Sequence, residues 1–352
     1  MLLLRVIAMV LIVDCFQLLG LLIASTVQSE TINNKVLKIA VLNTNFLTEK
    51  HFETLRTYGQ VTTYDDTDTQ EKAVTRLKDI DIAIVDPFKL SYDRQVFDKV
   101  SHLKLLVISC SGYNMVDVDA ARNRGILVAN AAGYCSDSMA EHVMGLILAV
   151  VRKIPLGNKL QHENPFEVDA DNSEHRIFSA YNLKGKTLGL IGLGHSGKRV
   201  AELAHAFGMR VLAFNRSYKN IENVTQVNSL EELLTSADVV SLHVPLSKST
   251  ENLISERELS LMKSSAIIIN VARGNIINTQ ALCNALKNKK IAGAGLDVLD
   301  EYHQGNPLLA LDNVVLTPHS AFYSEESYSN IANIMVNNVV SFVKGNAINI
   351  VN

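Results

Sequence analysis

The sequence predicts an α/β protein built on parallel β-sheets. Two observations carry this prediction: short apolar runs alternate with helical patterns along most of the chain, and one of these runs leads straight into a glycine-rich turn. The length of 352 residues is a third, because it suits two domains. We therefore expect two α/β units, each with its own hydrophobic core.

The first unit begins near Lys38. Helical patterns alternate with five apolar runs of strand length, which are Ile39 to Leu42, Val61 to Tyr64, Ile80 to Val85, Leu103 to Ser109 and Leu127 to Ala129. After the fourth run, Ser111 and Gly112 lie in a turn whose backbone amides are suited to hold a carboxylate. Taken alone, this segment is equally well interpreted as an ordinary turn.

The second unit centres on a glycine turn between two apolar runs, Thr187 to Ile191 and Val211 to Phe214. Gly192 permits the tight turn, Gly194 lets the backbone approach a pyrophosphate, and Gly197 allows close packing of the following helix on the strand. Three glycines at this spacing are a weak signal alone. Within a complete strand, turn, helix and strand they favour dinucleotide binding over a structural turn without nucleotide.

The end of the second strand of this unit indicates which nucleotide binds. An NAD site usually places an acid there for the ribose hydroxyl, whereas an NADP site offers a cation to the 2′-phosphate. The sequence continues with Asn215, Arg216 and Ser217, and the first acid is Glu222. We therefore favour NADP(H), with NAD(H) as the alternative if Arg216 is an ordinary solvated arginine.

The remaining segments continue the alternation. A long apolar helix is predicted from Met139 to about Ile154, and the polar stretch Gln161 to Ser179 is interpreted as a surface segment. The glycine unit is followed by predicted helices over Leu230 to Leu234, Glu256 to Met262, Gln280 to Lys287 and Glu325 to Lys344, and by predicted strands over Val239 to His243, Ala266 to Val271, Ala292 to Val298 and Val314 to Leu316.

Composition excludes several classes of partner. The formal net charge is −3, and no basic stripe interleaved with aromatic residues is present, so nucleic acid is not an expected ligand. The four cysteines are far apart, without any Cys-X-X-Cys pair: Cys15, Cys110, Cys135 and Cys283. This spacing argues against a zinc site or a disulfide framework, and we expect no metal.

Residues 1–34 do not fit the soluble pattern. An early Arg5 precedes an apolar stretch that reaches Ala24, although Asp14 and Gln17 interrupt it. A signal peptide, a membrane tether through residues 1–24 and an upstream extension of the reading frame all remain open. Leaving this segment aside, we expect a cytoplasmic protein.

Three further motifs follow the glycine turn in order. They are Ala272-Arg273-Gly274, Gly295-Leu296-Asp297-Val298 and Thr317-Pro318-His319-Ser320. With them the chain, from about residue 38 onward, resembles the D-isomer-specific 2-hydroxyacid dehydrogenases, closest to glyoxylate/hydroxypyruvate reductases and to the C-terminal-binding-protein-like branch. The resemblance implies two Rossmann-like, doubly wound domains. The nucleotide domain, residues 137–319, would be inserted into a flavodoxin-like substrate domain of residues 36–136 plus 320–352.

The same resemblance implies roles for single residues. Arg273 would bind the substrate carboxylate and carbonyl, and His319 would donate the proton. Family members carry a glutamate five residues after the aspartate of the second of these motifs, Asp297; here that position is Tyr302, and Glu301 is the nearest substitute. Asp297 would contact the nicotinamide carboxamide. Further cofactor contacts are expected from His195, Ser196, His243, Pro245 and Ala272.

The leading functional hypothesis is a reductase that transfers a hydride from NAD(P)H to a small 2-keto acid such as glyoxylate or hydroxypyruvate, giving a D-2-hydroxy acid. A homodimer is expected, since family members commonly dimerise through the nucleotide domain. The alternative is a dinucleotide-sensing binding module like the corepressor branch, with weak or no turnover, which the irregular region around Tyr302 favours. An NAD-linked enzyme working in the oxidative direction is disfavoured, because no acid directly follows Phe214.

Overall fold

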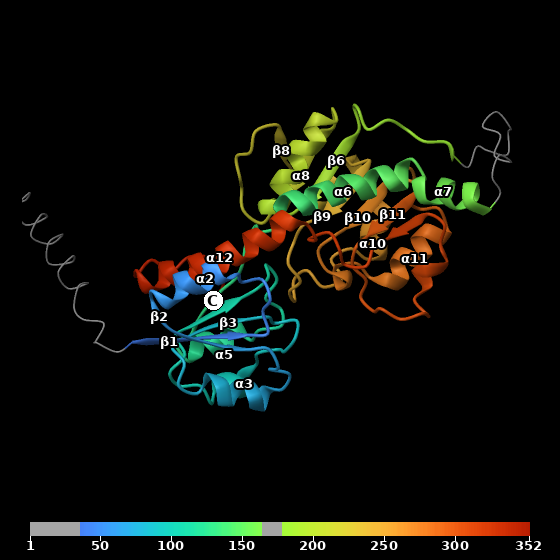
Figure 1. The fold of residues 1–352 in the computed structure, drawn as a ribbon. Coiled ribbons are helices and arrows are strands. Elements are labelled where there is room, and N and C mark those ends of the chain that lie inside the picture. Colours follow the sequence, from blue (N-terminus) through green and yellow to red (C-terminus); the bar gives the residue numbers. More distant parts are fainter. Residues whose placement is uncertain (1–35, 164–177) are drawn as a thin grey trace, which may run out of the picture.

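The computed structural model describes residues 36–163 and 178–352, so the predicted signal or anchor segment lies outside the described residues. The chain forms two α/β lobes, each with a wholly parallel sheet covered by helices on both faces (Figure 1). This confirms the predicted fold class. No helix within the described ranges has both the length and the apolar character that a membrane crossing requires.

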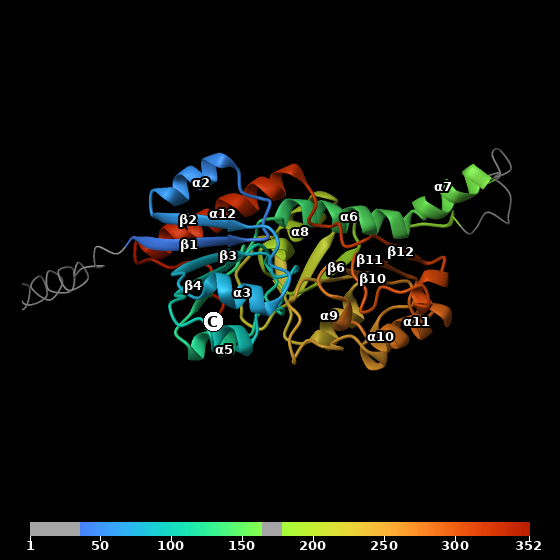
Figure 2. The same ribbon diagram turned by 60° about the horizontal axis from the view of Figure 1, so that its bottom comes forward.

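The first lobe contains a five-stranded sheet in the order β2-β1-β3-β4-β5. The strands are β1 (Leu37–Leu42), β2 (Gly59–Tyr64), β3 (Ile82–Val85), β4 (Leu105–Ile108) and β5 (Leu127–Ala129). Helices α2 (Glu49–Arg56) and α12 (Glu325–Val343) cover one face, and α3 (Gln70–Leu77), α4 (Arg94–Phe97) and α5 (Val118–Asn123) cover the other (Figure 2). The C-terminal helix thus returns to the lobe in which the described chain begins.

The second lobe contains a seven-stranded sheet in the order β12-β11-β10-β9-β6-β7-β8. The strands are β6 (Thr187–Ile191), β7 (Arg210–Phe214), β8 (Val224–Gln226), β9 (Val239–Leu242), β10 (Ile267–Asn270), β11 (Gly293–Leu296) and β12 (Val314–Leu316). Helices α6 (Ser136–Val151) and α8 (His195–Ala206) pack on one face, and α9 (Leu230–Ser236), α10 (Glu256–Leu261) and α11 (Thr279–Lys287) on the other. Short 3-10 turns η2 (Gly274–Ile276) and η3 (Pro307–Ala310) complete it.

The predicted elements differ from the observed ones mainly at their ends. Strands β3, β4, β9 and β10 are buried at every residue, which explains why they read as continuous apolar runs. Strand β8 escaped prediction because it lies at the sheet edge and has only three residues, two of them polar. Only pairing with β7 makes it a strand.

The long apolar helix was predicted with the wrong limits. Helix α6 begins three residues earlier, at Ser136, and ends at Val151. Lys153 then adopts a left-handed φ of 52°, and a separate helix, α7 (Ile154–Glu163), follows. Pro155 suits the first turn of this new helix, where its missing amide costs no hydrogen bond. Gln161 to Glu163, expected in a surface segment, belong to α7, while residues 164–177 lie outside the described part.

The chain passes between the lobes just before α6 and again after β12 (Figure 1). Helix α12 packs against α2 and β4 of the first lobe, and Met335 and Val339 are fully buried there. The two passages lie near the predicted domain limits, residues 136/137 and 319/320, which stay a prediction.

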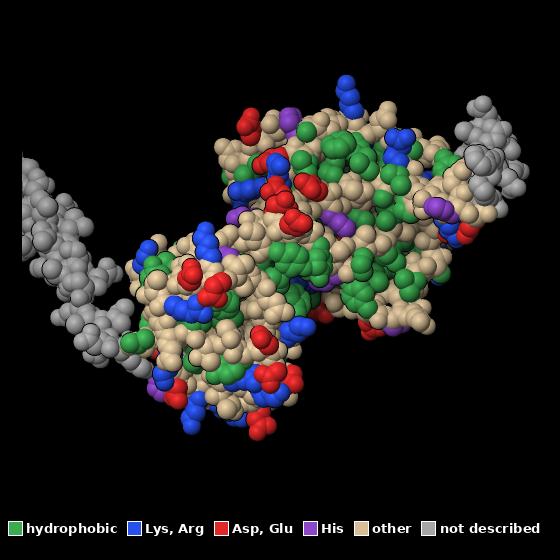
Figure 3. Space-filling view, in the orientation of Figure 1, with side chains coloured by type: hydrophobic (Ala, Val, Ile, Leu, Met, Phe, Trp, Pro, Cys, Tyr) green, Lys and Arg blue, Asp and Glu red, His purple; other side chains and the backbone are tan. Residues whose placement is uncertain are grey.

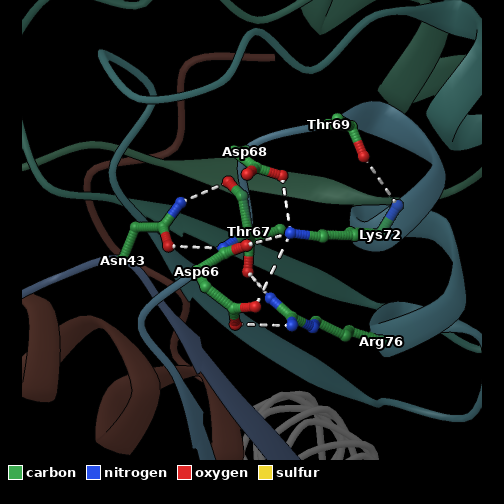
Figure 4. Close-up of polar contacts among 7 residues, drawn as sticks. All are labelled: Asn43, Asp66, Thr67, Asp68, Thr69, Lys72 and Arg76. Carbon is green, nitrogen blue, oxygen red and sulfur yellow. Dashed lines mark hydrogen bonds and ion pairs between the residues drawn. The ribbon is translucent and has the colours of Figure 1, made fainter.

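The loop after β1 is held by a polar network at the carboxyl edge of the first sheet (Figure 4). Asn43 has a φ of 56°, and its amide oxygen accepts a hydrogen bond from the Thr67 backbone N–H at 2.8 Å. The Asn43 amide nitrogen donates to the Thr67 carbonyl. Arg76 donates to both Thr67 Oγ1 and Asp66 Oδ1 at 2.6 Å. This network fixes the start of the loop that carries Phe46.

Candidate active site

A cavity of about 470 Å³ lies between the two lobes. Hydrophobic side chains gather on both sides of the hollow between the lobes (Figure 3). Most of the predicted site residues line this cavity, namely Ser111, Gly112, Gly194, His195, Ser196, Gly197, His243, Pro245, Ala272, Arg273, Asp297 and His319. Loops at the carboxyl ends of both parallel sheets supply them, as expected for α/β proteins.

Arg273 follows strand β10 and crosses toward the first lobe. Its guanidinium lies so close to Gly112 that a Cβ at position 112 would overlap Nη2. Nη1 donates to the Ala272 carbonyl at 2.7 Å, and Nε lies 3.4 Å from Oδ1 of Asn114. The structure therefore brings together Arg273 and Gly112, the two places at which the sequence predicts carboxylate binding. Asn114 was missed, because an asparagine beside a turn has an ordinary structural explanation.

His319 follows strand β12 and has a left-handed backbone with φ of 56°. Its backbone N–H donates to the carbonyls of Asp297 at 2.8 Å and Thr317 at 3.0 Å. Partial burial lowers the pKa of the imidazole, the positive charge of Arg273 lowers it further, and Asp297 acts in the opposite direction. The free protein therefore holds His319 as a weaker base than an ordinary histidine.

Asp297 holds the loop that carries His319. Its Oδ1 accepts hydrogen bonds from Thr317 Oγ1 at 2.6 Å and the Ser320 N–H at 2.8 Å, and its Oδ2 accepts one from the Ala321 N–H at 2.9 Å. His142 Nε2 lies 3.4 Å from Oδ1. Burial raises the pKa of the carboxyl, but the hydrogen bonds outweigh it and the pKa lies below its usual value. This bracing role was not predicted; a nicotinamide contact stays a prediction.

Glu301 is not placed beside His319 in this structure. Its carboxylate is 74% exposed and lies 3.1 Å from Nε2 of His303. It lines a separate pocket together with Asp300 and Asn306, and His319 does not line that pocket. Tyr302, at the family glutamate position, is exposed and its hydroxyl accepts a hydrogen bond from the Leu299 N–H at 3.1 Å. The expectation that Glu301 takes the place of the family glutamate beside His319 therefore has no support from this geometry.

The glycine turn has the geometry that a phosphate group requires. Gly192 has a φ of 98°, and a Cβ at Gly197 would overlap the Gly192 carbonyl. A Cβ at Gly194 would meet nothing within 4 Å, so the turn borders open space in the cavity. No side chain caps the N-terminus of α8, which leaves its first amides for a ligand. These residues fit the pyrophosphate of a dinucleotide.

The tip after β7 lies beside this turn. Asn215 Oδ1 accepts a hydrogen bond from the Leu193 N–H at 3.0 Å, and Lys219 Nζ donates to the Leu193 carbonyl at 3.0 Å. Arg216 and Ser217 are exposed and do not line the cavity. Lys219 thus places a cation beside the glycine turn.

His243 follows strand β9 on the opposite side of the glycine turn. Burial lowers the pKa of this imidazole to about 4, so the ring is neutral. Its Nε2 pairs with Ser241 Oγ at 2.8 Å, while Nδ1 is buried without a hydrogen-bond partner. An unpaired buried nitrogen in a ligand cavity fits a group that a bound cofactor completes.

Asp86 and a set of aromatic residues in the cavity were not predicted. Asp86 follows β3, and burial raises the pKa of its carboxyl. The aromatic residues are Phe46, Phe88, Tyr113, Tyr134, Phe322, Tyr323 and Tyr328. The rule that ligands bind at the carboxyl ends of parallel strands points to Asp86, but the aromatic residues come from five separate segments and have no common sequence signal.

Comparisons with known proteins agree with this geometry. Residues 144–321 match the family model described as D-isomer specific 2-hydroxyacid dehydrogenase, NAD binding domain. The chain is 36% identical to a glyoxylate reductase of Pyrococcus furiosus over 280 residues, covering 78% of this chain and 83% of that protein. It is 35% identical to a hydroxypyruvate reductase of Blautia hydrogenotrophica over 305 residues, covering 85% and 94%.

A solved structure is similar over nearly the same length. It is an acyclic imino acid reductase, Bsp5, in complex with NADPH and D-Arg. The TM-score is 0.83 and the identity 35%, and the match covers 90% of this chain and 100% of the other. The similarity therefore spans both lobes and the cavity between them.

Proposed function

The chain belongs to the D-isomer-specific 2-hydroxyacid dehydrogenase family, and on that premise we propose that it reduces a small 2-keto acid of the glyoxylate or hydroxypyruvate kind, preferably with NADPH. Membership of the family makes it an NAD(P)-dependent oxidoreductase that converts 2-keto acids to D-2-hydroxy acids. We choose glyoxylate and hydroxypyruvate as substrates because the similar proteins are a glyoxylate reductase and a hydroxypyruvate reductase. The observation that carries the proposal is the presence of Arg273 and His319 in one cavity.

The residues divide the chemistry between them. Arg273 binds the substrate carboxylate, and its planar guanidinium also polarises the adjacent carbonyl. A bound nicotinamide cofactor supplies the hydride that forms the new C–H bond at the carbonyl carbon. An imidazole N–H of His319 delivers the proton to the carbonyl oxygen as the C=O double bond becomes a single bond. Gly194, Ser196 and the amides at the start of α8 would hold the cofactor pyrophosphate.

His319 is protonated more readily when substrate is present. In the free protein, the charge of Arg273 lowers the His319 pKa. A substrate carboxylate on Arg273 offsets this charge, so the imidazolium is destabilised less when substrate is bound. This coupling would favour the protonated imidazole in a chain that carries Tyr302 at the position of the family glutamate.

Steady-state reduction of glyoxylate, hydroxypyruvate and pyruvate tests the proposal. We expect keto-acid-dependent oxidation of NADPH, followed at 340 nm, by protein that begins near residue 36. A panel without turnover with either cofactor would contradict the proposed activity and would favour the binding-module alternative.

The preference for NADPH is tested by Arg216→Ala. Arg216 follows β7, the position from which a cation reaches the 2′-phosphate of NADP. Loss of one charge-assisted hydrogen bond should lower kcat/KM for NADPH about 10- to 100-fold and leave kcat/KM for NADH within about threefold. Arg210→Ala, at the other end of the same strand, is the matched control. Equal losses with both cofactors would mean that Arg216 does not discriminate between them.

A homodimer is part of the same proposal. Helix α7 has no buried residue, and Ile154 at its start is 56% exposed. The helix extends from the second lobe (Figure 1), where a partner subunit would cover it.

A further inference from the structure

Seven aromatic residues line the cavity, and we call the six other than Tyr113 the aromatic wall: Phe46, Phe88, Tyr134, Phe322, Tyr323 and Tyr328. We propose that the aromatic wall is the compartment for the substrate side chain, and that the protein prefers 2-keto acids with an aromatic or branched apolar side chain over glyoxylate. The inference rests on the proposed function, because Arg273 and His319 are taken to hold the keto-acid head.

The rings form a continuous surface that includes the imidazole. The His319 ring has Phe88 at its edge on one side, with centroids 6.4 Å apart, and Phe322 on the other, at 5.8 Å. Phe322 stacks on Tyr323 at 4.4 Å. Tyr323 packs edge-on against Tyr328 at 5.6 Å, and Tyr328 stacks on Phe46 at 5.5 Å. The proton donor is therefore embedded in an apolar wall.

Substrate geometry directs the side chain onto this wall. A 2-keto acid has a carboxylate for Arg273, a carbonyl oxygen for His319 and a flat face for the cofactor. The remaining substituent of the carbonyl carbon is the side chain. It is bonded to the same carbon as the oxygen that contacts His319. Because Phe88 and Phe322 flank that imidazole, an apolar substituent that leaves the carbonyl carbon on this side can pack against either ring.

The aromatic wall is anchored but uncovered. The Asn43 and Thr67 pair holds the loop of Phe46, the Phe88 N–H donates to Asp86 Oδ1 at 3.0 Å, and the Tyr323 N–H donates to the Ser320 carbonyl at 2.9 Å. Even so, Phe88 is 54% and Tyr323 58% exposed. Glyoxylate, whose only substituent is hydrogen, would leave these rings in water. An aryl or isobutyl group would cover them and gain the free energy of apolar burial.

Asp86 adds a selection against acidic side chains. It lines the same cavity as the aromatic wall, at the end of β3. A carboxylate there repels a second negative charge on the substrate, so 2-oxoglutarate is expected to be a poor substrate.

The test compares kcat/KM for phenylpyruvate, 4-methyl-2-oxopentanoate, pyruvate, glyoxylate and 2-oxoglutarate. We expect phenylpyruvate to exceed glyoxylate about 10- to 100-fold, which corresponds to burial of one large apolar group. Phe88→Ala and Tyr323→Ala should each lower this ratio about tenfold. Phe207→Ala, which removes a 44% exposed phenylalanine at the end of α8 that does not line the cavity, should leave the ratio unchanged.

The outcomes separate the two proposals. The proposed function stands but the compartment is overturned if glyoxylate is reduced and kcat/KM for phenylpyruvate does not exceed that for glyoxylate. The same holds if Phe88→Ala and Tyr323→Ala both leave the ratio of these two constants unchanged. If no keto acid is reduced, the proposed function fails, and calorimetric titration of the protein with phenylpyruvate and pyruvate decides about the compartment. Tighter binding of phenylpyruvate, lost in Phe88→Ala, supports it, and equal affinity overturns it.

Discussion

Replacing His319 with asparagine is expected to lower kcat for keto-acid reduction about 10²- to 10⁴-fold, the usual contribution of a general acid. Asparagine is chosen because position 319 has a left-handed backbone, which asparagine tolerates better than most residues. The loss should therefore reflect the missing proton and not a misfolded loop. Single-turnover kinetics would separate the chemical step from product release.

His205→Asn, in the exposed last turn of α8, is the matched control and should retain wild-type kcat. Equal melting temperatures for wild-type protein and both variants would show that the fold is intact. A His319→Asn variant with nearly full activity would assign the proton to another group in the cavity, and Asp86, with its raised pKa, would then be the first to test.

The same group sets the pH dependence. Reduction needs the protonated imidazole, so kcat/KM should fall as the pH rises through the pKa of His319 in the free protein, which lies below the ordinary value of 6.5. The limb in kcat should lie at higher pH, because bound substrate offsets the charge of Arg273. Both limbs should disappear in His319→Asn. Limbs at the same pH in kcat and kcat/KM would contradict the coupling between substrate and histidine.

Replacing Arg273 with alanine is expected to lower kcat/KM about 10²- to 10⁴-fold, since two charge-assisted hydrogen bonds of about 1.5 to 3 kcal/mol each are lost. Arg273→Lys keeps the charge but not the planar fork and should recover only part of this loss. The loss should appear in KM and kcat together if the guanidinium grips both the carboxylate and the carbonyl.

Cofactor binding provides the control for Arg273. Calorimetric Kd values for NADPH should agree within about twofold between wild type and Arg273→Ala, because the glycine turn and α8 are built from other residues. Arg257→Ala, at a 70% exposed side chain on α10, should leave all constants unchanged. An Arg273→Ala variant with unchanged kcat/KM would place carboxylate binding elsewhere, for instance on the amides of Ser111 and Gly112.

Sequence patterns predicted most of the fold because parallel strands buried on both faces are continuous apolar runs. Strand β6, which is buried at every residue, was predicted with its observed limits for this reason. The glycine turn was predictable because each glycine answers a local steric demand, as the φ of Gly192 and the close approach of Gly197 show. Element ends were less predictable, as at Lys153, where one helix stops and another begins.

The sequence by itself determined the two-lobed parallel α/β architecture and the glycine turn, since local periodicity and motif spacing encode these features, whereas Arg273 and His319 were singled out by the resemblance to the family. Only the tertiary structure decided what surrounds them. In the folded protein, the Arg273 guanidinium lies against Gly112, and Asp297 accepts hydrogen bonds from the loop of His319. Glu301 lines a different pocket, and the aromatic wall lines the cavity. The physical reason is that these contacts join segments more than a hundred residues apart or depend on loop conformation, and neither leaves a periodic trace in the sequence.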